Sequence, residues 1–314
     1  MPWTKAETLR IFASMAAPSR RLAGSRRIER TVQGVRLSLP RSHLLPVYAR
    51  VKPSYGQNLV QLAAGLAAPR PADGLPLRVL DIGANIGDSA LQIAAASGAE
   101  VLCVEGDPYW VGYLHDNVDG NPAITVEEVL LVPEDRELPG MSPVRDHGTT
   151  RFVEGGPDTG GLPASTATEL RRRHPGFDRL RLVKSDTDGF DPVLVPAAAR
   201  AWADSGPVLF FEFDPELARK AGNPPNHLWS ELAALGYARL AVWDNSGDPL
   251  GQLDVGDAPR RAGTLEPKPV ELGYHFWDVA ACRADDDPAI RVFDELVPMA
   301  FDPLGTRRPP ASTG

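Results

Sequence analysis

From residue 77 onward, apolar positions fall into two kinds of run. Seven short runs are continuously apolar, as buried strands are, and most are separated by segments whose apolar positions have helical spacing. These runs predict an α/β fold with a seven-stranded, mostly parallel sheet that helices cover on both faces. A long turn-rich stretch before the last run favours an antiparallel final strand. Strands are predicted at 77–83, 100–106, 123–129, 180–186, 207–213, 238–244 and 274–282, and helices at 87–97, 108–117, 192–202, 215–221 and 226–235.

The segments outside this rhythm divide the chain into three parts. Residues 6–17 predict a helix, 27–40 a strand pair or a strand edge, and 54–68 a further helix. We therefore expect residues 1–68 to form a lead-in segment over one end of the next domain. Residues 69–285 hold the α/β domain. Residues 286–314 are acidic and then proline-rich, and they predict a tail that is at least partly mobile.

Charge and cysteine content narrow the function classes. The net charge is −8; residues 1–52 carry eleven Lys or Arg and two Asp or Glu, which is +9, so the remainder carries −17. The overall acidity argues against nucleic acid as a partner, and docking of the basic segment on the acidic body is favoured over binding of an anionic substrate. Cys103 and Cys282 lie in apolar runs and predict buried free thiols in a reducing compartment. No signal-peptide pattern and no apolar run of roughly 18 residues is present, so we expect a cytoplasmic protein without a membrane partner.

The stretch VLDIGANIGDS (79–89) predicts a strand, a glycine turn and a helix start. A phosphate-binding loop needs Lys and Ser or Thr directly after its last glycine, whereas Gly87 is followed by Asp88 and Ser89. A dinucleotide fingerprint needs a second glycine for close approach to a pyrophosphate, and this turn lacks one between Gly83 and Gly87. Both phosphate-binding interpretations are therefore disfavoured.

The remaining features of the turn predict a cationic nucleoside ligand. Asp81 ends the first strand, where its carboxylate would attract an ammonium group, and Glu105 ends the next strand, where an acid commonly accepts both ribose hydroxyls. An amine and a ribose without phosphate describe S-adenosylmethionine; the alternative is a purely structural strand-to-helix turn. The predicted cofactor site consists of Asp81, Gly83, Asn85, Gly87, Asp88, Ser89, Glu105, Gly106 and Asp107.

Five blocks between about 77 and 245 together resemble the FkbM family of S-adenosylmethionine-dependent methyltransferases: VLDIGANIGDSALQIA, VLCVEGDP, LRLVKSDTDGFDPVLVPAA, PVLFFEFDPE and LAALGYARL. The resemblance implies a Rossmann-like class I methyltransferase sheet of seven strands with the last antiparallel, and O-methylation of a hydroxyl. Where the family most often has Lys-Ile-Asp-Val-Glu-Gly, residues 184–189 are Lys-Ser-Asp-Thr-Asp-Gly. Asp188 is thus shorter than the glutamate that it replaces.

The predicted catalytic residues follow the fourth strand. Asp186 and Asp188 lie at the edge where open α/β sheets bind ligands, and alternate positions on a strand share a face. An aliphatic hydroxyl is too weak an acid for prior deprotonation by a carboxylate, so its proton leaves during attack or with help from a metal. Asp188 is the predicted base, and Lys184 neutralises the acidic cluster or positions the substrate. Asp186 and Glu212 are candidate ligands for Mg²⁺, which prefers carboxylate oxygens.

Several further residues have rival interpretations. Asp191 and Asp214 each precede a proline and predict helix caps. His43, His174, His227 and His275 are rival bases, of which His174 and His227 are more consistent with solvated positions, and Tyr55 lies where a lid could close over the cofactor.

Three function classes are consistent with the sequence. The first is an S-adenosylmethionine-dependent O-methyltransferase for a small hydroxylated metabolite, such as a sugar or a secondary-metabolite intermediate. The alternatives are an NAD(P)-dependent oxidoreductase and a non-catalytic cofactor-binding partner protein. The apolar helix at 6–17 also suggests a homodimer formed through residues 1–68.

Overall fold

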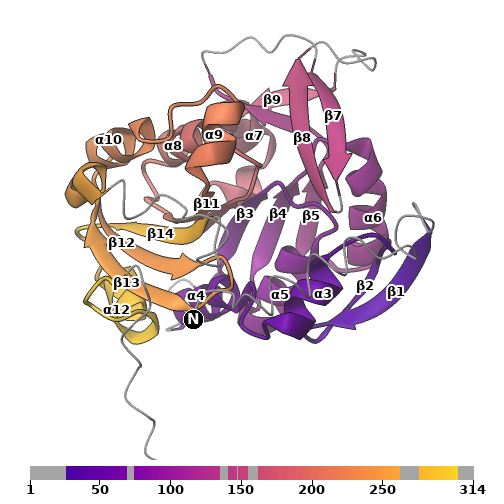
Figure 1. Cartoon of the computed structure of the whole chain (residues 1–314), viewed down its shortest axis with the longest axis horizontal. Helices are drawn as coiled ribbons and strands as arrows, with labels where there is room; N and C mark the ends of the chain where they lie inside the picture. Colours follow the sequence, from indigo (N-terminus) through magenta and orange to yellow (C-terminus); the bar gives the residue numbers. More distant parts are fainter. Residues whose placement is uncertain are drawn as a thin grey trace, which may run out of the picture.

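The computed structural model describes residues 26–68, 74–134, 141–146, 148–154, 162–261 and 276–302. The expected helix at 6–17 and the candidate base His275 lie outside these residues. The centre of the molecule is an eight-stranded sheet (Figure 1). Its strands, from one edge to the other, are β13 (Pro249–Asp254), β12 (Tyr237–Asp244), β14 (Trp277–Arg283), β11 (Val208–Phe213), β10 (Leu182–Ser185), β3 (Arg78–Ile82), β4 (Glu100–Val104) and β5 (Ile124–Glu127).

The predicted α/β fold with a mostly parallel sheet is confirmed. Strands β5, β4, β3, β10 and β11 run parallel to one another, and β14 lies antiparallel between β11 and β12. The count differs by one strand, because β13 pairs with β12 inside the stretch that the sequence left as turns. That strand has a glycine at residue 251 and a proline at its first position, which weakened its strand pattern.

The order of the strands creates a switch point between β3 and β10. From β3 the chain continues outward to β4 and β5, and then returns to build β10 and β11 on the opposite side of β3. Two crossovers that leave in opposite directions open a crevice at the carboxyl ends of the strands, which is where open α/β sheets bind ligands.

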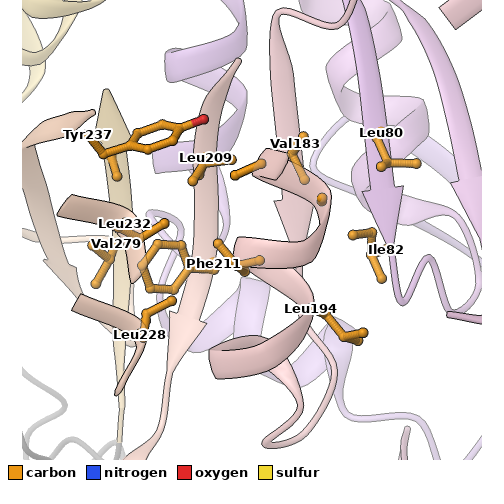
Figure 2. Close-up of a cluster of buried hydrophobic side chains, with 14 of the residues drawn as sticks. Leu80, Ile82, Val183, Leu194, Leu209, Phe211, Leu228, Leu232, Tyr237 and Val279 are labelled. Atoms are coloured by element: carbon orange, nitrogen blue, oxygen red, sulfur yellow. The ribbon is translucent and has the colours of Figure 1, made fainter. Parts of the chain in front are cut away.

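Alternate side chains of each central strand enter two different apolar cores. Leu80, Val183 and Phe211 face the core that includes α8 and α10, as Figure 2 shows. Their neighbours Val79 and Leu182 face the second core, which includes α4, α5 and α12. The helices on the first side are α7 (Ala167–Arg173), α8 (Asp191–Ala201) and α10 (His227–Ala234), and those on the second are α4 (Gln57–Ala67), α5 (Asp88–Ser97), α6 (Pro108–Val118) and α12 (Asp287–Leu296).

The predicted strand pair near the N-terminus is an antiparallel hairpin of β1 (Arg27–Val32) and β2 (Val35–Pro40). Its turn residues Gln33 and Gly34 have φ of 46° and 90°, the left-handed pair that a tight hairpin with native twist requires. Leu37 packs with Trp110 of α6 and with Ile86 of the glycine turn. The hairpin and α3 (Leu45–Val51) therefore pack beside the predicted site, against α5, α6 and the glycine turn.

Several elements were not predicted. Strand β6 (Leu130–Val132) pairs with β9 (Ala164–Thr166), and β7 (Met141–Asp146) forms a hairpin with β8 (Thr149–Glu154) that rises over β4 and β5 in Figure 1. Short 3-10 helices at Pro175–Phe177, Val255–Asp257 and Pro259–Arg261 were not predicted either. In contrast, helix α9 (Pro215–Lys220) was predicted, and it follows β11.

The expected tail from residue 286 begins as a helix. Asp286 caps α12 by accepting a hydrogen bond from the backbone N–H of Ala289 at 3.1 Å, and Phe293 is fully buried against the core on the α4 side. The acidic residues of α12 lie on its solvent face, and its apolar residues face the core. The prediction of a tail rested on the acidic composition and overlooked the helical spacing of the apolar residues. Among the described residues, no helix has the length and apolar composition needed to cross a bilayer.

Candidate functional site

Three adjoining cavities follow the carboxyl edge of the sheet at the switch point. The β4 cavity lies between Glu105, Val129, Leu131, Phe152, Phe190 and Leu194. The turn cavity lies between the glycine turn and α3, and the acidic cavity lies between α4 and the ends of β10, β11 and β14. Asp186 lines all three, so they form one continuous cleft. Their open volumes, which include space continuous with solvent, are about 730, 930 and 710 Å³ respectively.

The glycine turn is built by close backbone packing. Gly83 has φ of 73°, and a Cβ there would lie 2.1 Å from the carbonyl oxygen of Asp186. Gly87 has φ of 82° and precedes α5, and a Cβ there would lie 2.7 Å from Leu114 Cδ1 of α6. Asn85 has φ of 51°, which asparagine tolerates better than most residues. The two glycines thus bring the turn against β10 and α6 while the backbone between them lines the cleft.

Glu105 ends β4 and lines the β4 cavity. Its Oε2 accepts a hydrogen bond from the backbone N–H of Asn85 at 2.8 Å, and its Oε1 accepts one from Asp107 N–H at 2.8 Å. Burial raises the pKa of Glu105 to about 7, even though both hydrogen bonds favour the ionised form. Each oxygen keeps a second lone pair, so the ionised carboxylate can accept two further donors from a ligand.

Gly106 lines the same cavity, whereas Asp107 does not reach it. A Cβ on Gly106 would lie 2.9 Å from Leu130 Cα, so this glycine permits close packing of β4 against β6. Asp107 is fully buried and caps α6 through Tyr109 N–H. The Arg145 guanidinium donates to both Asp107 oxygens at 2.6 Å. Asp107 therefore anchors the β7–β8 hairpin beside the cavity and lines none of the three cavities.

Asp81 is also placed differently from the expectation. Its side chain is fully buried and lines none of the three cavities. Lys184 Nζ lies 2.8 Å from Asp81 Oδ1 and donates to the carbonyl oxygen of Gly83 at 2.9 Å. Burial alone would lower the pKa of Lys184, but Asp81 and Asp186 raise it above its ordinary value. The pair thus clamps the turn to β10, and an amine in the cleft would meet other carboxylates first.

Asp88 and Ser89 line both the turn cavity and the acidic cavity from the first turn of α5. Burial raises the pKa of Asp88 to about 6, partly against the attraction of Lys184. Ser89 Oγ donates to Asp81 Oδ2 at 3.3 Å. Asp88 therefore lines the cleft beside the glycine turn, where the sequence had placed Asp81.

Asp186 and Asp188 follow β10, as predicted, and both line the β4 and turn cavities. Only Asp186 also lines the acidic cavity, and its side chain is exposed in the cleft. Asp188 has φ of 49°, and the next residue, Gly189, accepts a hydrogen bond from Asn223 Nδ2 at 2.9 Å. This tight turn directs the chain into α8 and separates the two carboxylates along the cleft.

Glu212 of β11 pairs in register with Asp278 of β14, and both line the acidic cavity. Burial raises the pKa of Glu212 well above its ordinary value, with further contributions from Asp186 and Asp188. Burial likewise raises the pKa of Asp278 to about 7, although Asn58 Nδ2 donates to its Oδ2 at 2.7 Å. Sequence reasoning missed Asn58 and Asp278, because their proximity to Glu212 depends on the order of the strands.

The predicted magnesium site is not supported. Asp186 and Glu212 share the acidic cavity, but within the part of the chain that the structure describes, no group of three or more His, Cys, Asp or Glu side chains has an arrangement that could hold a metal ion. We therefore derive no step through a metal.

The two predicted helix caps have different outcomes. Asp214 caps α9 by accepting hydrogen bonds from Glu216 N–H and Leu217 N–H, as predicted. Asp191 is instead the first residue of α8, and its carboxylate accepts a hydrogen bond from Ser185 Oγ at 2.7 Å. Burial raises the pKa of Asp191 to about 6. It braces the loop that carries the candidate catalytic carboxylates.

Of the rival bases, His43 lies at the cleft and two others do not. His43 lines the turn cavity, with its Nε2 3.4 Å from Asn85 Oδ1. His174 pairs with Glu127 at 2.8 Å and His227 with Glu231 at 3.4 Å, and neither lines a cavity of the cleft. Tyr55 lines the turn and acidic cavities, with its ring 5.2 Å from that of Tyr48. The lid role of Tyr55 stays a prediction.

No protein-family model matches this sequence, and no curated protein is significantly similar to it. Among solved structures, the chain is similar to an O-methyltransferase from Bacillus cereus in complex with SAH, with 12% identity, a TM-score of 0.41, and coverage of 73% of this chain and 80% of that one. It is similar to TYW2 of P. horikoshii in complex with MeSAdo, with 14% identity, a TM-score of 0.42, and coverage of 83% and 73%. It is also similar to the N-methyltransferase NodS of Bradyrhizobium japonicum, with 10% identity, a TM-score of 0.39, and coverage of 74% and 86%. The identities of all three are at most 14%, and their TM-scores are at most 0.42.

Proposed function

We propose that this protein is an S-adenosylmethionine-dependent methyltransferase that methylates a hydroxyl group of a small metabolite. The observation that carries the proposal is the β4 cavity. Glu105 stands at the end of β4 with two unused acceptor positions, and beyond it lies a slot formed by Val129, Leu131, Phe152 and Leu194. A carboxylate that accepts a ribose diol next to an apolar slot for a flat base fits an adenosine.

The remainder of the cleft fits the cationic part of the same molecule. The turn cavity continues from the β4 cavity past Asp186 and Asp188 to Asp88. Its one lysine, Lys184, is neutralised by Asp81, so this part of the cleft has a net negative charge. A sulfonium and an ammonium group would be stabilised here, whereas a pyrophosphate would be repelled by the same carboxylates. This charge pattern opposes the oxidoreductase alternative.

When bound, the cofactor would supply a methyl group on a positively charged sulfur. Attack by an acceptor oxygen would form the new C–O bond, and the C–S bond electrons would remain on a neutral thioether. The chain must orient that acceptor and take its proton. Asp186 is better placed for this role than Asp188. Both residues line the β4 and turn cavities, but of the two only Asp186 also lines the acidic cavity. We therefore assign Asp186 as the base that accepts the hydroxyl proton during attack, and Asp188 as a residue of the cofactor side.

The acceptor class rests on the FkbM-like block around residues 184–189. That resemblance supports O-methylation and leaves the acceptor to be identified by its fit to the acidic cavity. A non-catalytic cofactor-binding protein would have no use for a second cavity that shares Asp186 with the first.

Calorimetric titration with S-adenosylhomocysteine and, separately, NAD tests the proposal. Wild type should bind S-adenosylhomocysteine saturably, and Glu105→Ala should weaken that binding at least tenfold while the fold is retained. Glu128→Gln removes a carboxyl on the exposed surface, where Glu128 pairs with His115, and serves as the matched control. Absence of S-adenosylhomocysteine binding, or preferential NAD binding, would overturn the proposal.

A further inference from the structure

We propose that the acidic cavity receives a protonated amine of the methyl acceptor, so that the substrate class is a hydroxylated amine. The inference rests on the proposed function, because it concerns the part of the cleft beyond the cofactor. Four observations about this cavity support it: its charge, its unpaired acceptors, its aromatic walls and its position along the sheet.

The ionisable side chains that line the acidic cavity are almost all carboxyls. Glu212 and Asp278 contribute from β11 and β14, Asp186 from the end of β10, and Asp88 from α5. Lys184 is the single basic residue among the described residues that line it, and its Nζ lies 2.8 Å from Asp81. Among the described residues of this lining, four carboxyls thus face a single lysine.

Two buried acceptors point to a ligand independently of the carboxylates. Asn245 lines the cavity and is 7% exposed, and its Oδ1 has no hydrogen-bond partner among the described residues. Asn58 lines the same cavity and is 2% exposed; its Nδ2 donates to Asp278, but its Oδ1 has no partner either. A buried acceptor without a donor costs about 1–3 kcal/mol, which a ligand with N–H or O–H donors would recover.

The surroundings favour a cation over a neutral polyol. An ammonium group has three donors and no acceptor, which matches a cavity lined by carboxyl groups and by two unpaired amide oxygens. Tyr55, Phe210 and Phe276 also line the cavity, and aromatic faces attract cations. Burial raises the pKa values of Glu212 and Asp278, and an ammonium between the two carboxyls would favour their ionised forms.

The acidic cavity shares Asp88, Ser89 and Asp186 with the turn cavity and extends beyond it to residues that line neither cavity of the cofactor side, Glu212 and Asp278 among them. Glu212 and Asp278 lie on β11 and β14, which are on the opposite side of β3 from Glu105 and β4. Of the residues that line the β4 cavity, only Asp186 also lines the acidic cavity. A hydroxyl carried by the same molecule as the amine could therefore lie beside Asp186 while the amine is held beyond it.

Binding of simple amines to the protein saturated with S-adenosylhomocysteine tests the inference. Ethanolamine and glucosamine are each compared with a neutral partner, ethylene glycol and N-acetylglucosamine, by saturation-transfer NMR titration. We expect both amines to bind saturably and at least tenfold more tightly than their neutral partners. Glu212→Gln and Asp278→Asn should each weaken amine binding about tenfold, equivalent to about 1.4 kcal/mol. Asp254→Asn, which removes an exposed carboxyl at the end of β13, should leave amine binding unchanged.

The outcomes separate this inference from the proposed function. If S-adenosylhomocysteine binds but neither amine does, or if the neutral partners bind as tightly, the amine assignment is overturned and the proposed function stands. If the amines bind and S-adenosylhomocysteine does not, the proposed function fails and the cavity remains an amine site. Both cavity variants preserve side-chain volume, and retained S-adenosylhomocysteine binding verifies that they are folded.

Discussion

At the scale of single residues, Glu105 has the most direct link between environment and function. Because burial raises its pKa to about 7, the carboxyl changes charge within the physiological range. Only the ionised form can accept both hydroxyls of a ribose while it also accepts the N–H groups of Asn85 and Asp107.

We therefore predict that S-adenosylhomocysteine affinity falls as pH is lowered through the pKa of Glu105. Below about pH 7 the loss should approach roughly tenfold per pH unit, since each unit reduces the ionised fraction by that factor. Calorimetry at about pH 8 and about pH 6 measures the effect. Glu105→Gln should bind weakly with little pH dependence, and an equally steep profile in this variant would assign the titration to another group.

The pair of Lys184 and Asp81 is a structural clamp with a testable energy. Both side chains are buried, at 5% and 0% exposed, so removal of the lysine leaves an unpaired carboxylate in the interior. We predict that Lys184→Met lowers the free energy of unfolding by about 3–5 kcal/mol in urea titrations. Lys184→Met combined with Asp81→Asn should recover much of this loss, and a double variant no more stable than the single one would contradict the clamp.

At the scale of elements, the glycine turn depends on how closely β3, α5 and α6 approach one another. Gly87 combines φ of 82° with a site where Cβ would lie 2.7 Å from Leu114 Cδ1. Gly112, in the middle of α6, has no atom within 4 Å of its Cβ position and so provides a matched control.

We predict that Gly87→Ala lowers the free energy of unfolding by about 1–3 kcal/mol, from the backbone strain and the side-chain overlap together. Gly112→Ala should be neutral or stabilising by up to about 1 kcal/mol, because alanine is the better helix former. Chemical denaturation of the two variants and the wild type gives the comparison. Equal effects of both substitutions would show that α5 and α6 can move apart without cost.

The sequence predicted those strands and turns that depend on local signals. The strands β3, β4, β10 and β11 and the turn at Gly83 follow from apolar runs and glycine spacing, and the structure contains them within one or two residues at each end. The acidic cavity was beyond this reasoning. The hydrogen bond between Asn58 and Asp278 joins residues 220 positions apart, and only the placement of β14 beside β11 brings Asp278 to Glu212. The ion pair of Asp81 was likewise beyond local signals, because its partner Lys184 lies on a neighbouring strand.

At the scale of the whole molecule, the acidic interior makes stability depend on pH. Burial raises the pKa of Glu105 and Asp278 to about 7, and those of Asp88 and Asp191 to about 6. The folded protein therefore binds more protons than the unfolded chain between about pH 4 and about pH 7, so stability decreases as pH rises through this window.

We expect the melting temperature to be higher at about pH 6 than at about pH 8 at constant ionic strength, as measured by circular dichroism. The double variant Glu212→Gln, Asp278→Asn should reduce this slope, since two of the groups that take up protons on folding are then absent. A melting temperature that rises with pH over the same range would show that these carboxyls are ionised without penalty in the folded state.

The position of β14 has a consequence for synthesis of the protein. Among the described strands β14 is the last in the chain, yet it lies between β11 and β12. A ribosome completes all the other described strands of the sheet before it reaches β14. Until then the growing chain lacks the strand between β11 and β12, and the edges of both strands are unpaired. Unpaired edges readily capture other chains. A ribosome that stalls shortly before residue 277 would therefore release a product that lacks β14 and is prone to aggregate, and chaperones would need to protect the nascent protein until β14 is made.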